Sequence, residues 1–103
     1  MIISTTGSIA GKEISETLGM VKGNTIRAKH IGKDILAGLK SIIGGEITQY
    51  TEAMSDAREE AIERMTKQAQ ELGADAIVSV RFTTSQVMPN AAELLVYGTA
   101  VKL

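Results

Sequence analysis

The stretch AREEAIERMTKQAQELGADAIVSV, from Ala57 to Val80, contains the change of hydrophobic period that decides the fold. Up to Leu72 the apolar residues recur every three or four positions, which is the spacing of one face of an α-helix. After Gly73 they alternate, which is the spacing of a strand with one buried face. Glycine is also the residue that most often ends a helix. The stretch therefore predicts a helix, a glycine cap and a strand directly after the cap.

The predicted helix begins at about Thr48 or Thr51 and ends at Leu72. One face is solvated, and its Glu60–Arg64 and Glu63–Lys67 pairs have the favourable i,i+4 orientation, worth about 0.3 kcal/mol each. The other face forms a continuous stripe of Met54, Ala57, Ala61, Met65, Ala69 and Leu72.

A long hairpin follows the helix. Its first arm is ADAIVSVRFTTSQV, with a turn at MPN and a return arm ELLVYGTAVKL that ends at Leu103. Each arm spans roughly 36–40 Å if straight, so we expect the strands to bend or to reach a neighbouring subunit. Gly98 predicts a bulge or a bend in the return arm. Alternation in the first arm predicts a single face made of Ala76, Val78, Val80 and Phe82.

The first part of the chain predicts strands and a second helix. Ile2 to Thr5 reads as a short strand, and Gly23-Asn24 as a tight turn between two strands. Helical spacing from Ile31 to Ile43 predicts a helix that stops at Gly44-Gly45. The expected fold is therefore α+β, a single domain over residues 1–103 with a curved antiparallel sheet and a long C-terminal hairpin, packed against two helices.

Composition narrows the classes of function. The 103 residues carry a net charge of −1, no cysteine and few aromatic residues. Nucleic-acid binding is not expected, because there is no basic tract and stacking platforms for single strands need more aromatic side chains. Thiolate metal sites and disulfides are excluded. No signal peptide and no apolar run of membrane-spanning length are present, so we expect a cytoplasmic protein that does not enter a membrane.

Arg58 is the first candidate site residue, because its helical angle places it among the apolar residues of the stripe. One interpretation is an ion pair with Asp34, Glu46 or Glu52, within the subunit or across an interface. The other is an anion site formed by Arg58 beside Gly44, Gly45 and the start of the helix.

His30 is the only histidine. With Asp34 at i+4 it could hold a metal ion, although two ligands do not complete a zinc or nickel site. The alternative is a cap where a strand gives way to a helix. The chain contains neither a phosphate-binding glycine loop nor a nucleophile elbow, so catalysis gains little support.

Several segments together resemble the YbjQ family of small prokaryotic proteins. They are HIGKDILAGLKSIIGG, the glycine pair followed by Tyr50, AREEA, LGADAIVSVRF and YGTAV, and the resemblance covers nearly the whole chain. It implies an α+β subunit and a ring-like homo-oligomer, a pentamer. The family name includes heavy-metal binding, yet this chain lacks the thiolates that soft metals prefer. The residues carried over by position are Gly44, Gly45, Tyr50, Arg58, Gly73, Asp75, Gly98 and Thr99.

Three hypotheses of function follow. The leading one is a non-enzymatic homo-oligomeric binding or scaffold protein, with any small ligand near Gly44, Gly45, Tyr50 and Arg58. The second is a metal-ion-binding protein that uses His30, Asp34 and acidic residues at or between subunits. The third is an enzyme that acts on a small anionic metabolite in a cleft between subunits. The identity of any cofactor is left open.

Overall fold

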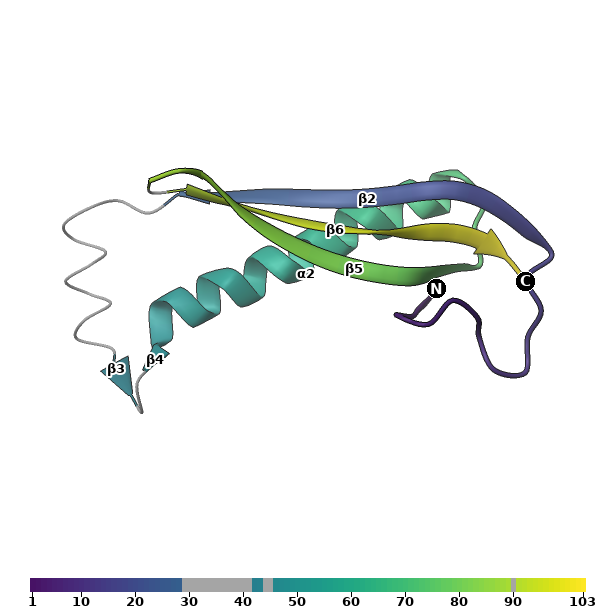
Figure 1. The fold of residues 1–103 in the computed structure, drawn as a ribbon, viewed down its shortest axis with the longest axis horizontal. Coiled ribbons are helices and arrows are strands. Elements are labelled where there is room, and N and C mark those ends of the chain that lie inside the picture. Colours follow the sequence, from purple (N-terminus) through teal and green to yellow (C-terminus); the bar gives the residue numbers. More distant parts are fainter. Residues whose placement is uncertain (29–41, 44–45, 90) are drawn as a thin grey trace.

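The computed structural model describes residues 1–28, 42–43, 46–89 and 91–103, which form a four-stranded sheet, a two-stranded sheet and one helix (Figure 1). The α+β class and the C-terminal hairpin are confirmed. Two helices were expected, and the described residues hold one. The elements are β1 (Ile2–Ile3), β2 (Glu16–Ala28), β3 (Ile42–Ile43), β4 (Glu46–Ile47), α2 (Thr48–Glu71), β5 (Ala76–Met88) and β6 (Ala91–Lys102).

The main sheet has the strand order β1-β5-β6-β2. The predicted hairpin pairs β5 with β6 in antiparallel register, from Ala76 opposite Val101 to Met88 opposite Ala91. β2 pairs antiparallel with the other side of β6, and β1 adds a short parallel pair to β5. The sheet is therefore mixed rather than purely antiparallel, because the N-terminal strand runs alongside β5.

Helix α2 covers one face of this sheet, and the predicted stripe is confirmed from Ala57 to Ala69. Leu72 was wrongly included, because it lies beyond the end of α2 at Glu71 and is 45% exposed. Ala57, Ala61, Met65 and Ala69 are fully buried, and they pack in one cluster with apolar residues of β2, β5 and β6. The helix ends as expected, with Gly73 at φ 79° and its N–H donating to the carbonyl of Gln70 at 3.0 Å. A small-residue stripe lets the helix approach the strands closely.

Gly23 was predicted to lie in a turn, and that prediction is wrong. β2 runs straight through it as one strand of 13 residues. A Cβ at this position would overlap the carbonyl oxygen of Ala61 and lie 2.6 Å from the backbone nitrogen of Met65. The glycine is therefore needed because the backbone of α2 crosses directly over β2, and not because the chain turns.

A bulge in β5 corrects the predicted face of the first hairpin arm. Ser79 has φ 54°, and the pairing with β6 shifts between Val78 and Arg81. The extra residue reverses the alternation. Ile77 and Val80 consequently join the cluster under α2, whereas Ala76 and Val78 belong to a second cluster, and Phe82 is 46% exposed. The bulge predicted at Gly98 in the return arm is wrong, because the extra residue lies in β5 opposite Gly98, which itself pairs regularly with Val21. Gly98 is needed for close packing instead, since an added Cβ would lie 2.7 Å from Ile77 Cγ2.

The end of the first predicted helix is also corrected. Ile42 and Ile43 form β3 and pair antiparallel with Ile47 and Glu46 of β4. An antiparallel pair of two-residue strands directly before α2 thus takes the place of the last helical turn. The remainder of that predicted helix, with the glycine pair after it, lies outside the described residues.

Candidate functional site

Most of the residues predicted to form a site lie where the structure gives no description. His30, Asp34, Gly44 and Gly45 are outside the described residues. Tyr50 belongs to the first turn of α2, and its side chain is not described. Their roles as metal ligands, ligand-binding groups or interface residues therefore stay predictions.

Arg58 has the predicted position on α2 but an exposed side chain. The buried stripe begins at Ala57, and Figure 1 shows the N-terminal half of α2 diverging from the sheet. The side chain of Arg58, which follows the first buried residue of the stripe, is therefore not enclosed between α2 and the sheet. The predicted carboxylate partners have undescribed side chains, so its pairing stays a prediction.

An ion-pair network joins α2 to β2. Arg27 Nη2 donates to Glu60 Oε2 at 2.5 Å, and Arg64 Nη2 donates to Glu60 Oε1 at 2.6 Å. The hydrogen bond from Arg27 lowers the pKa of the Glu60 carboxyl, partial desolvation opposes the shift, and the charges of Arg64 and Arg27 add to it. The Glu60–Arg64 pair was predicted from spacing, whereas Arg27 comes from another element and was missed.

The two long edges of the main sheet differ in how their backbone groups are used. On β2, the N–H of Lys22 donates to Gln68 Oε1 at 2.7 Å, and the carbonyl of Asn24 accepts from Arg64 at 2.5 Å. Side chains of α2 therefore occupy this edge. On β5, the N–H groups of Ser79 and Val80 donate to carbonyls of Thr6 and Ser4.

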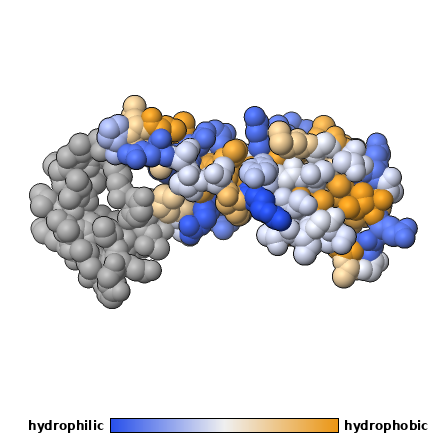
Figure 2. Space-filling view, viewed as in Figure 1, coloured by the Kyte–Doolittle hydropathy of each residue, from blue (hydrophilic) through white to orange (hydrophobic). Residues whose placement is uncertain are grey.

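After Val80, β5 continues with β6 as its one neighbour among the described strands. We call residues 82–88, on the side away from β6, the distal edge. Every residue of this segment is exposed, including Val87 and Met88, the latter at 58%. Figure 2 shows hydrophobic side chains at the surface near the tip of the hairpin.

The face of the sheet opposite α2 is covered over part of its length. Residues 4–15 fold back over it, and Ile9 and Ile14 pack with Ala76, Val78 and Val101. Arg81 holds this segment through Nη1, which donates to the carbonyl of Thr5 at 2.8 Å. Short hydroxyl contacts link Ser4, Thr6 and Ser8 within it.

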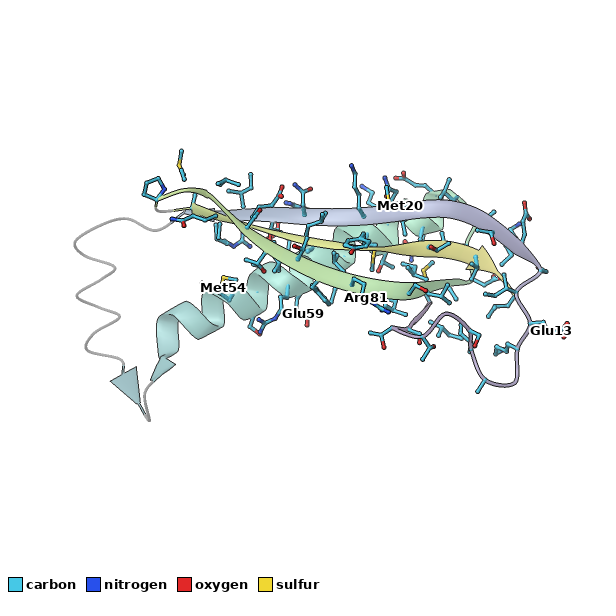
Figure 3. All side chains as sticks on the ribbon, in the orientation of Figure 1. Glu13, Met20, Met54, Glu59 and Arg81 are labelled. Atoms are coloured by element: carbon cyan, nitrogen blue, oxygen red, sulfur yellow. The ribbon has the colours of Figure 1, made fainter. Side chains whose placement is uncertain are left out.

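The rest of this face is open. We call it the open face, and Figure 3 shows Met20 on β2 and Arg81 on β5 at its two sides, with β6 between them. Met20 is 69% exposed and Tyr97 is 37% exposed. The open face is formed by four residues of β2 and their four partners on β6. They are Met20, Lys22, Asn24 and Ile26, with Thr99, Tyr97, Leu95 and Glu93.

Other kinds of site find no support in the described part of the chain. Residues 1–28, 42–43, 46–89 and 91–103 contain no group of three His, Cys, Asp or Glu side chains placed to hold a metal ion. No helix among them is both long enough and apolar enough to cross a membrane.

Comparisons with known proteins agree with the motifs. A family model described as "putative heavy-metal-binding" matches residues 1–103. A UPF0145 protein of Archaeoglobus fulgidus is 65% identical over 103 residues, covering 100% of this chain and 95% of that protein. A UPF0145 protein of Methanosarcina acetivorans is 61% identical, with 100% and 97% covered.

A solved structure shares the fold. It is a protein of unknown function of the DUF74 family from Pediococcus pentosaceus, with a TM-score of 0.68 and 21% identity over 100% of this chain and 97% of that one. The chain therefore belongs to the YbjQ family, whose UPF0145 relatives match it along its full length.

Proposed function

We propose that this protein is a non-enzymatic homo-oligomeric scaffold or binding protein whose subunits join through the distal edge of β5. The observation that carries the proposal is an exposed edge of seven residues, 82–88, beside a sheet whose other long edge is occupied by side chains of α2.

The chemistry of this edge favours pairing with another strand. Alternate residues of an edge strand direct their N–H and C=O groups away from the sheet, where a further strand can bond them. Proteins protect free edges with charged side chains, proline or covering segments. The sequence FTTSQVM of residues 82–88 has no charge and no proline, and threonine, valine and phenylalanine favour strands.

A second copy of the chain is the partner we propose. The edge is neutral, so a different surface of a second copy can pack against it without strong charge repulsion. Exposed Phe82, Val87 and Met88 add apolar area beside the backbone contacts. The subunit is elongated, with a radius of gyration of 16.9 Å against about 13 Å for a compact domain of 100 residues. The exposure of every residue from 82 to 88 shows that α2 does not bury this part of the sheet.

We propose more specifically that five subunits form a ring in the cytoplasm. The family resemblance supports this number, and a ring requires that each subunit present two different surfaces to its neighbours. The distal edge would be one of them. An enzymatic role gains no support from Glu60, the one described group with a clearly shifted pKa, because two arginines engage it.

Native mass spectrometry of the purified protein tests the proposal. Wild-type protein should appear at a multiple of the chain mass, with five as the expected number. Thr84→Lys should shift it to the monomer, because a lysine on an edge strand opposes strand addition. Gln70→Lys adds the same charge to exposed α2 and should leave the mass unchanged.

Two results would overturn the proposal: a wild-type monomer at micromolar concentration, or a Thr84→Lys variant that keeps the wild-type mass. Additional mass in subunit stoichiometry would instead favour the metal-binding alternative. Loss of that mass in His30→Asn would then assign the metal to His30.

A further inference from the structure

We propose that the open face of the sheet binds a nucleotide, with Tyr97 stacking on the base and Arg81 binding the phosphate. This site is independent of the distal edge and goes beyond the scaffold function. It rests on a row of three side chains in register across three strands.

The register places Tyr97 between two cations. Tyr97 of β6 is the partner of Lys22 on β2 and of Arg81 on β5. Side chains of directly opposite residues on one sheet face lie about 4.5–5.5 Å apart at Cβ. The row therefore reads Lys, Tyr, Arg, with the aromatic ring on the central strand.

The row faces away from α2. On β2, Val21, Gly23 and Thr25 lie against the helix, and Thr25 Oγ1 donates to the Ala57 carbonyl at 3.3 Å. Lys22 is between them in sequence and so points to the other side. Tyr97 likewise alternates with buried Val96, and its exposed fraction of 37% leaves part of the ring accessible.

The charges of the row lack a protein counter-ion. Within the described residues, salt bridges form only between Glu60 and its two arginines, so no carboxylate there pairs with Lys22 or Arg81. Glu93, on the same face, accepts from Asn24 Nδ2 at 3.3 Å. Two cations beside an aromatic ring attract a ligand that combines negative charge with a flat π-system.

Arg81 is the better phosphate-binding group of the two. Its Nη1 donates to the carbonyls of Thr5 and Val80, both at 2.8 Å, which holds the guanidinium in one place. Arginine has five N–H donors, so others are left for an anion. The hydroxyl groups of Thr5 and Ser8 belong to the segment that Arg81 contacts at the Thr5 carbonyl, and hydroxyls are donors of the kind that phosphates accept.

The rest of the site fits a base. Met20 and Thr99 form the neighbouring cross-strand pair on the open face. Exposed Met20 supplies a polarizable side chain that packs well against an aromatic ring. There is one aromatic residue on this face and no basic tract in the chain, which suits a single nucleotide and not a nucleic-acid strand.

Isothermal titration of the full chain with AMP, adenosine and inorganic phosphate tests the site. AMP should bind saturably, and adenosine and phosphate should each bind at least about tenfold more weakly, since each makes half of the contacts. Tyr97→Ala and Arg81→Gln should each weaken AMP binding about tenfold or more, because stacking and charge are removed separately.

Tyr97→Phe keeps the ring and should bind AMP as wild type does. Lys67→Gln removes a charge from α2, on the opposite side of the sheet, and should also bind normally. If Tyr97→Ala does not fold, the Arg81→Gln variant still tests the site, because unchanged AMP binding by that variant would contradict the role of Arg81. No saturable binding of AMP up to millimolar concentration would overturn the proposal, as would unchanged binding by folded Tyr97→Ala.

The size of the ligand is tested in the same titration. A short oligothymidylate that bound more tightly than AMP would overturn the assignment to a single nucleotide. Phosphate that bound as tightly as AMP would overturn the role of Tyr97. The oligomeric state does not enter these comparisons, so a failed scaffold proposal would leave them intact.

Discussion

Gly23→Ala is the substitution for which the structure makes its sharpest prediction. The added methyl group would overlap the carbonyl oxygen of Ala61 and lie 2.6 Å from the nitrogen of Met65. Both are backbone atoms in the middle of α2, so relief requires that the whole helix move from the sheet. Overpacking costs typically 1–3 kcal/mol, and the fixed neighbours place this case near about 3 kcal/mol.

Chemical and thermal unfolding at one fixed protein concentration measure this effect, because oligomers melt in a concentration-dependent way. About 3 kcal/mol corresponds to a fall in Tm of roughly 12–24 °C in a domain of this size. Gly7→Ala is the matched control, since its added Cβ would meet only Ser79 Oγ at 3.6 Å. A Gly23→Ala protein within about 1 kcal/mol of wild type would refute the close crossing of β2 and α2.

Two further predictions concern the ion network and the bulge. Because Glu60 has a lowered pKa when folded, its stabilising contribution is full above the unfolded pKa and is lost as the pH falls through the folded pKa. We expect urea titrations of the wild type to show a decrease in stability below about pH 4.5, and Glu60→Gln should flatten that decrease. An unchanged pH profile in the variant would contradict the network. Ser79 has φ 54°, so Ser79→Gly should raise stability by up to about 1 kcal/mol, whereas Ser79→Val should lower it by more. Calorimetry that ranked valine above glycine at this position would show that the bulge is not strained.

The parts of the fold that depend on neighbours in sequence were predictable. The stripe of α2, its end at Gly73 and the C-terminal hairpin all follow from local periodicity and from the conformational preference of glycine. Gly23 was misread because a Gly-Asn pair resembles a turn. The glycine is actually required by contacts with residues of α2 that lie 38 or more positions later in the chain.

The candidate site was less predictable for the same physical reason. The bulge at Ser79 reverses which residues of β5 face α2, and it lies opposite Gly98, where a side chain would crowd Ile77 and Val80. Arg27 of β2 forms an ion pair with Glu60 of α2. Tyr97 becomes the neighbour of Lys22 and Arg81 only through the register of three strands. Alternation along one strand shows a face, but it does not show which residues of other strands share it.

The pairing order of the sheet has a consequence for synthesis on the ribosome. In the described part of the chain, β1 pairs with β5 and β2 pairs with β6, so both N-terminal strands bond to segments made after residue 75. Helix α2 contains its own hydrogen bonds and is free to form in the nascent chain. Strand β6, the partner of both β2 and β5, is the last of these elements to be synthesised. The sheet therefore cannot assemble until β6 has been synthesised, and until then the apolar residues of β2 lack their partner strand and are accessible to chaperones.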